Sequence, residues 1–228
     1  MPVVSFLNQK GGVGKTTLAT NVATALALAG HKLFFIDADP QGSSLDWSAS
    51  RQGELLFPVV GVPKDTLHRE IAALSAPYDW VVIDGPPRVY TVAKSAIAAS
   101  DLVIIPVQPS PYDIWAAKEV VDIIADVRVL KPNLIAVFAI NRKIANTAIG
   151  RDVTAALANY ADIPILAASI TQRVSFAESA ASGQSVLEVE PHGPASHEIR
   201  ALTAEITELV HEQDSKHQDQ PAKHAAVS

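Results

Sequence analysis

A glycine-rich segment flanked by two lysines is the part of the sequence whose residue types most directly suggest chemistry. Residues 10–17 read Lys-Gly-Gly-Val-Gly-Lys-Thr-Thr, between an apolar run predicted as a strand and an Ala-rich run predicted as a helix. Glycines let backbone N–H groups surround phosphate oxygens without Cβ clashes, and a helix N-terminus adds partial positive charge. Lys15 is therefore expected to reach the β- and γ-phosphates of a nucleotide, and the Thr16 hydroxyl to ligate Mg²⁺. The alternative is a glycine-rich turn that carries lysines by chance.

Three aspartates follow predicted strands and could serve the same site. Asp37 and Asp39 follow the run 33–36, and Asp84 follows the run 80–83. Carboxylates at the carboxyl ends of strands point into the crevice where ligands bind in open α/β sheets. The alternatives are a solvated turn held by an Asx motif and, for Asp84, an ordinary strand-ending aspartate.

The loop departs from the standard phosphate-binding pattern, because Gln9 stands where a glycine is usual and Lys10 follows it. In this form it resembles the "deviant" Walker A signature, xKGGxGK[ST], of the ParA/MinD-type ATPases. The resemblance runs from residue 2 to about residue 210 and is greatest to the small ParF-like partition ATPases. It implies that Lys10 reaches the ATP bound in a partner subunit, so that two subunits sandwich two nucleotides. The expected ATP-binding residues of the loop are Lys10, Gly11, Gly12, Val13, Gly14, Lys15, Thr16 and Thr17.

The same resemblance implies roles for the acidic residues. Asp39 would orient the attacking water, Asp37 would lie near Mg²⁺, and Asp84 would be the Walker B aspartate that holds Mg²⁺ directly or through water. The expected catalytic residues are therefore Lys10, Lys15 and Asp39, and the expected metal site is Thr16, Asp37 and Asp84.

Contacts to adenine and to DNA are also implied only by the resemblance. Asn141 and Arg142 stand where the family contacts adenine, although a structural turn is the alternative for Asn141. Non-specific DNA binding in the family uses basic residues of the C-terminal half. The candidates here are Arg142, Lys143, Arg151 and Arg173, each of which could equally be part of a solvated surface.

The elements that position these residues alternate between short β-branched runs and Ala-rich helical runs. This pattern predicts an α/β fold: a mostly parallel, twisted sheet with helices on both faces, of the P-loop NTPase class with a deviant Walker A. The predicted strands are 3–7, 33–36, 80–83, 102–107 and 135–140, and the predicted helices are 15–28, 65–75, 91–99, 112–129, 148–160 and 196–211. We expect one ATPase domain at 1–211 and a disordered polar tail at 212–228.

The proline-rich stretch 106–111 is stiff and has few backbone donors, so it is predicted not to belong to an interior strand. Ser110 and Pro111 suit the N-cap and the first position of the following helix. The stretch could be a simple turn, or it could lie at a dimer interface, as the resemblance to ParF-like proteins implies.

Composition limits the classes of function. The 228 residues are 48% hydrophobic, enough for a large core, and the absence of cysteine excludes thiolate chemistry and thereby the electron-donating reductases that share this loop. A formal charge of −6 gives no overall attraction to nucleic acid, so DNA binding would need a local basic patch. No apolar run is long enough for a transmembrane helix, and a cytoplasmic location is expected.

The expected function is that of a ParA-like partition or positioning ATPase that hydrolyses ATP to ADP and phosphate. It would dimerise on Mg²⁺-ATP, with possible higher assembly, and bind DNA non-specifically, which would place the ATP state on the nucleoid. A cargo-bound adaptor, such as a centromere-binding protein, would stimulate hydrolysis; the cargo could be a plasmid, a chromosome or a protein assembly. The alternative is a MinD-like membrane-associated regulator, which the acidic last helix disfavours. A small-molecule kinase or synthetase would need an insertion that is not evident.

Overall fold

The fold is built on strands that are mostly apolar, as expected of a sheet that is covered on both faces. The computed structural model describes residues 1–144 and 148–218, without the side chains of 148–152, 214 and 216–218. Within these residues the strands form one parallel sheet in the order β3-β2-β4-β1-β5-β6-β7. They are β1 (Val3–Phe6), β2 (Leu33–Asp37), β3 (Val59–Gly61), β4 (Trp80–Asp84), β5 (Leu102–Val107), β6 (Ile135–Lys143) and β7 (Ile165–Thr171).

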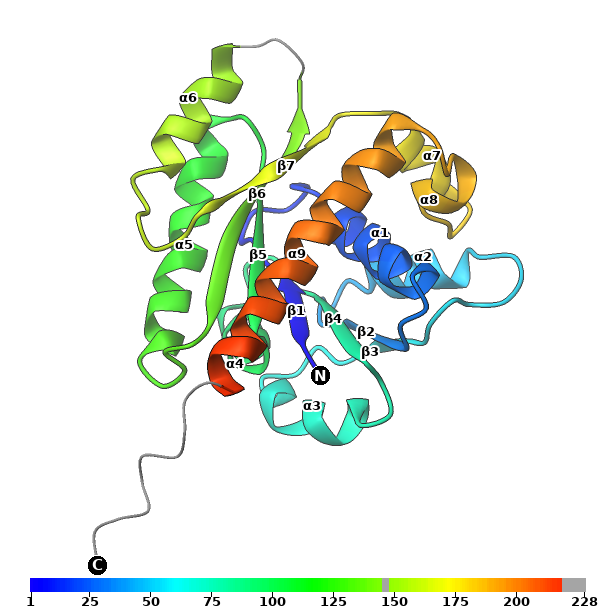
Figure 1. The fold of residues 1–228 in the computed structure, drawn as a ribbon, viewed down its shortest axis with the longest axis horizontal. Coiled ribbons are helices and arrows are strands. Elements are labelled where there is room, and N and C mark those ends of the chain that lie inside the picture. Colours follow the sequence, from blue (N-terminus) through cyan, green and yellow to red (C-terminus); the bar gives the residue numbers. More distant parts are fainter. Residues whose placement is uncertain (145–147, 219–228) are drawn as a thin grey trace, which may run out of the picture.

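Helices cover both faces of the sheet (Figure 1). Those on one face are α1 (Lys15–Leu28), α2 (Ser43–Ala49), α7 (Ser175–Ala181), α8 (Val186–Val189) and α9 (Pro194–Gln218). Those on the other are α3 (Leu67–Ser75), α4 (Tyr90–Ala99), α5 (Pro111–Arg128) and α6 (Ala148–Leu157). Each layer encloses its own apolar cluster, and the inner strands contribute side chains to both. The predicted fold class is therefore confirmed.

The prediction for the proline-rich stretch was wrong in one respect. Pro106 lies within β5, which is an interior strand, and is in register with Ala139 of β6. Ile104, two residues earlier, accepts a hydrogen bond from Leu7 on the β1 side, so Pro106 also faces that side. The β1 ladder has ended there, and the Asn8 side chain donates to the Pro106 carbonyl at 2.8 Å. The missing N–H of Pro106 therefore leaves no bond unmade.

The last helix also differs from the predicted bounds. Helix α9 begins at Pro194 and runs to Gln218, through part of the predicted tail. Gln213 donates to the Asn133 carbonyl at 2.8 Å, and the 211–218 segment is rich in residues that favour helix. Residues 219–228 lie outside the described residues, so the division into a domain and a tail stays a prediction.

Candidate functional site

The glycine-rich loop connects β1 to α1 and has the backbone shape that its glycines allow. Gly12 and Gly14 have φ of 76° and 94°, in the left-handed region that favours glycine. A Cβ on Gly14 would also lie 2.2 Å from Asn141 Nδ2. A side chain at position 14 is therefore disfavoured by both strain and space.

Lys15 begins α1 and turns its side chain back into the loop. The residue is only 6% exposed, and its ammonium donates to the Lys10 carbonyl at 3.4 Å. Burial lowers the pKa of Lys15, while Asp84 and Asp39 oppose that shift. A partly desolvated cation inside a loop of glycine N–H groups is suited to bind phosphate.

Two neighbouring strands end in carboxylates beside this loop. Asp37 ends β2 and Asp84 ends β4, and the two residues are in register. Asp84 Oδ2 accepts from the Thr16 hydroxyl at 2.6 Å and from the Ser44 hydroxyl at 2.7 Å. Asp37 Oδ2 accepts from the Ser44 backbone N–H at 2.9 Å. The strand ends thus bring together all three residues predicted for the metal.

The electrostatics of the two carboxylates favour the binding of a cation that is not part of the protein. Burial raises the pKa of Asp84 to about 7, with the Asp37 charge adding to the rise and hydrogen bonds and Lys15 opposing it. Burial also raises the pKa of Asp37, although three backbone N–H groups oppose the rise. Asp84 Oδ1 is buried without a hydrogen-bond partner. An added cation would satisfy this oxygen and hold both carboxylates ionised.

The donor set suits magnesium in particular. Mg²⁺ takes oxygen ligands, commonly one or two carboxylates together with substrate phosphates and waters. Thr16, Asp84 and Asp37 offer a hydroxyl and two carboxylates beside the phosphate loop. No cluster of three or more His, Cys, Asp or Glu able to hold a metal occurs in the described residues, and phosphate oxygens or waters could complete the coordination.

Asp39 lies at the mouth of this cluster. It is half-buried, and its Oδ1 accepts from the Gln41 N–H at 2.9 Å, which is the Asx turn considered above. It is also close enough to Lys15 to affect the pKa of that lysine. Asp39 can therefore form the Asx turn and also lie beside a bound phosphate.

Lys10 is held within its own subunit. Its ammonium contacts Asp113 Oδ2 at 2.6 Å; the Lys10 side chain is 35% exposed, whereas the Asp113 side chain is fully buried. Asp113 lies in the first turn of α5, which begins at Pro111 after Ser110, as predicted. To reach a partner subunit, Lys10 would have to leave Asp113.

Asn141 supports the loop in this structure. Its amide Nδ2 donates to the Val13 carbonyl at 2.7 Å, and its Oδ1 accepts from the Arg142 N–H at 2.9 Å. Arg142 is exposed, with a φ of 51°. The predicted adenine contacts of both residues stay a prediction.

Two of the other basic candidates, Lys143 and Arg173, lie near the paired ends of β6 and β7, where the Gln172 N–H donates to the Lys143 carbonyl at 3.1 Å. Lys143 is exposed, with its ammonium 3.4 Å from Ser169 Oγ. Arg173 forms an ion pair with Glu198 at 2.8 Å, so its charge is partly neutralised. Arg151 lies in α6, but its side chain is outside the described residues. DNA binding by these residues stays a prediction.

Two residues of the site were not predicted, namely Ser44 and Asp113. Ser44 is fully buried and contacts both metal-site carboxylates, and Asp113 is the partner of Lys10. Asp84 lies 40 positions from Ser44, and Lys10 lies 103 positions from Asp113, so no local pattern marked these contacts.

Taken together, the parallel sheet, the glycine loop before α1 and the strand-end carboxylates define a P-loop nucleotide-binding protein. Comparison with known proteins agrees. Residues 4–186 match the family described as "CobQ/CobB/MinD/ParA nucleotide binding domain". The chain belongs to this family.

Individual relatives and structures are similar along most of their length. The chain is 28% identical over 207 residues to maintenance of carboxysome distribution protein A of Halothiobacillus neapolitanus, covering 89% of this chain and 95% of that protein. It is 30% identical over 240 residues to the chromosome-partitioning ATPase Soj of Thermus thermophilus, covering 92% and 96%. A solved structure of apo McdA from Cyanothece has a TM-score of 0.75 at 17% identity, covering 92% and 99%. The Mg-ADP complex of MinD from Pyrococcus horikoshii has a TM-score of 0.72 at 18% identity, covering 93% and 98%.

Proposed function

We propose that this protein is an ATP-hydrolysing positioning ATPase whose Mg²⁺-ATP state is a homodimer that binds DNA and is reset by a cargo-bound partner. The observation that carries the proposal is that Thr16, next to the loop lysine Lys15, donates a hydrogen bond to Asp84 at 2.6 Å. It supports a nucleotide site with a place for magnesium. The names of the relatives, which include a chromosome-partitioning ATPase and a carboxysome-distribution protein, support positioning of a large cargo.

In the proposed reaction, the chain binds the triphosphate, excludes bulk water and positions one water molecule. Backbone N–H groups of the loop and Lys15 would bind the phosphates, and the Thr16 hydroxyl, which donates to Asp84, would offer an oxygen lone pair to the metal. When bound, Mg²⁺ neutralises phosphate charge in the transition state. Asp39, at the mouth of the site, would orient the attacking water.

Lys10, the other lysine of the loop, is the reason for proposing a dimer. Lys10 lies on the same loop, and its side chain is partly exposed. Its ammonium contacts Asp113 rather than a residue of the phosphate site. A lysine so placed can add positive charge to a nucleotide held by a second subunit. Lys10→Ala is therefore expected to impair ATP-dependent dimerisation more than nucleotide capture.

Within the described residues, the last helix does not offer the surface that the membrane-bound alternative requires. A membrane-binding last helix needs a free apolar face with cationic residues opposite. In α9 the apolar residues Ile199, Leu202, Ile206 and Val210 are buried in the core. No helix of the described residues is long and apolar enough to cross a bilayer.

Paired sedimentation experiments would test the proposal. The protein with Mg²⁺-ATP is mixed with duplex DNA in one sample and with anionic liposomes in another, and ADP replaces ATP in matched controls. Sedimentation with DNA only in the ATP samples is expected, and it should weaken with salt because counterions are released. Sedimentation with liposomes alone would support a membrane regulator, and sedimentation with neither would contradict the DNA part of the proposal.

A further inference from the structure

Helix α2 has polar contacts at both of its ends, and its first turn meets the metal-site carboxylates. Ser44 is fully buried; its hydroxyl donates to Asp84 at 2.7 Å, and its backbone N–H donates to Asp37 at 2.9 Å. The Leu45 N–H also donates to Asp37, at 3.1 Å. The position of this turn therefore depends on where the two carboxylates point.

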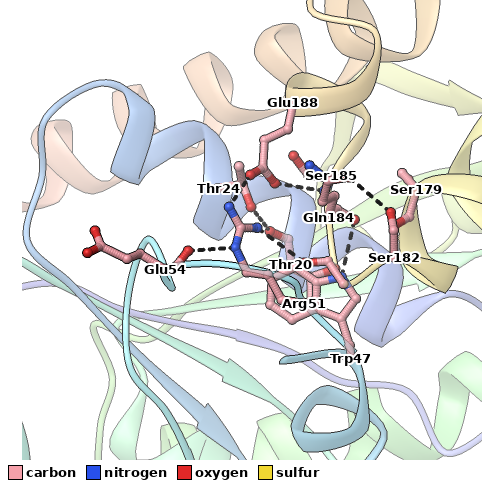
Figure 2. Close-up of polar contacts among 11 residues, drawn as sticks. Thr20, Thr24, Trp47, Arg51, Glu54, Ser179, Ser182, Gln184, Ser185 and Glu188 are labelled. Carbon is pink, nitrogen blue, oxygen red and sulfur yellow. Dashed lines mark hydrogen bonds and ion pairs between the residues drawn. The ribbon is translucent and has the colours of Figure 1, made fainter. Parts of the chain in front are cut away.

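The other end of α2 is attached to residues 183–188, which we term the 183–188 segment. Arg51, just beyond α2, donates to the Gly183 carbonyl at 3.2 Å and forms an ion pair with Glu188 at 2.5 Å. The Trp47 indole N–H donates to the Gln184 carbonyl at 3.2 Å. Figure 2 shows Arg51 and Trp47 reaching this segment from one side. Both side chains of the ion pair are nearly buried, at 11% and 12% exposed.

Backbone atoms meet directly at this junction. Gly183 has a φ of +65°, and a Cβ placed on it would lie 2.4 Å from Arg51 N and 2.6 Å from Trp47 O. Both atoms belong to the main chain, which cannot move aside as a flexible side chain can. A shift of α2 is therefore passed to Gly183 rather than absorbed by side chains.

The 183–188 segment is attached to the phosphate-loop helix as well. The Val186 N–H donates to Asn21 Oδ1 of α1 at 3.0 Å. Glu188, besides pairing with Arg51, accepts from the Ser185 N–H at 2.9 Å in the capping box that begins α8. The segment thus contacts α1, which begins at the loop lysine, and α2, which contacts the carboxylates.

We propose that α2 couples magnesium binding to the position of the 183–188 segment, with Ser44 and Arg51 as positioning residues at its two ends. A cation that takes the unpartnered Oδ1 of Asp84 as a ligand would turn this carboxylate and so change the hydrogen bond that its Oδ2 accepts from the Ser44 hydroxyl; the first turn of α2 is then repositioned and the Gly183 junction follows. The inference rests on the proposed nucleotide and magnesium site. By linkage, a partner whose affinity for the 183–188 segment changes when Mg²⁺ binds would change the affinity for Mg²⁺ by the same factor.

Hydrogen exchange followed by mass spectrometry tests this coupling. The protein is compared with ADP and EDTA, with ADP and Mg²⁺, and with Mg²⁺ alone; ADP is used so that ATP-driven dimerisation does not contribute. With ADP and Mg²⁺, we expect slower exchange in peptides covering 8–17, 43–51 and 183–188. A response at 8–17 without one at 183–188 would overturn the coupling and leave the nucleotide site intact. No response anywhere would refute both proposals.

Variants separate coupling from simple packing. Arg51→Gln should weaken the response at 183–188 and keep the response at 8–17, because the contacts of the Arg51 side chain are with Glu54, Gly183 and Glu188. It should also reduce the gain in ADP affinity that Mg²⁺ produces, by about fivefold or more. The matched control is Arg128→Gln, which removes an arginine that donates to the Leu134 carbonyl in the other layer. An unchanged response in folded Arg51→Gln, checked by its melting temperature, would refute the proposal.

A double variant tests whether each of the two substitutions acts only on its own surroundings. Ser44→Ala and Arg51→Gln act at opposite ends of one helix, and residues in one network have non-additive effects. The double variant should therefore lose no more of the Mg²⁺-dependent gain than the stronger single variant. Independent, additive losses would contradict transmission through α2.

Discussion

Replacing Asp113 with asparagine should strengthen ATP-dependent dimerisation, because it releases Lys10. In the present structure Lys10 and Asp113 form an ion pair at 2.6 Å. A hydrogen bond to a charged group contributes about 1.5–3 kcal/mol, and we take the lower end because Lys10 is 35% exposed and solvent screens its charge. A dimer breaks two such contacts, so the cost is about 3 kcal/mol, equivalent to about a hundredfold in the dimer dissociation constant.

Analytical ultracentrifugation in Mg²⁺-ATP measures the dimer dissociation constant. The proteins compared also carry a substitution that prevents ATP hydrolysis. Asp122→Asn is the matched control, since it removes an exposed carboxylate paired with Lys118 at 2.6 Å on the same helix and should change dimerisation little. Unchanged or weaker dimerisation of Asp113→Asn, with its melting temperature preserved, would show that the ion pair does not restrain Lys10.

Three further predictions concern the site itself. Lys15→Gln should weaken Mg²⁺-ATP binding about 10- to 100-fold in a calorimetric titration, and unchanged affinity would remove Lys15 from the phosphate site. Asp39→Ala should bind ATP and dimerise but release phosphate at least about a hundredfold more slowly; normal turnover would exclude Asp39 from the mechanism. Since burial raises the pKa of Asp84 to about 7, protons compete with metal, so the affinity for Mg²⁺ should fall as pH drops below about 7 and level off above it. Asp84→Asn should flatten this pH profile of nucleotide titrations at fixed Mg²⁺, and a wild-type profile that is already flat would contradict the shifted pKa.

The sequence predicts the strands and helices that build the centre of the fold. The inner strands β1, β2, β4 and β5 are mostly apolar runs, and both ends of α1 were predicted at the residues where they lie. The edge strands were missed for physical reasons. Strand β3 has only three residues, and β7 contains an Ala-Ala pair of low strand propensity. These strands form because neighbouring elements pack beside them, which no local pattern records.

The site shows the same division between local and distant information. The loop 10–17 and the strand-end aspartates are recognisable because their chemistry requires fixed spacing in the chain. Ser44, Arg51 and Asp113 depend on contacts with residues far away in sequence, and their residue types are ordinary for a helix or a turn. Only the folded chain brings them together.

A crystal structure of the chain with Mg²⁺ and a non-hydrolysable ATP analogue tests the central claim most directly. We expect phosphate oxygens within hydrogen-bond distance of the loop N–H groups and of the Lys15 ammonium. We also expect a metal bound by the Thr16 hydroxyl, with Asp84 as a direct or water-mediated ligand. A triphosphate bound elsewhere, or a metal without the Thr16 hydroxyl among its ligands, would contradict this expectation.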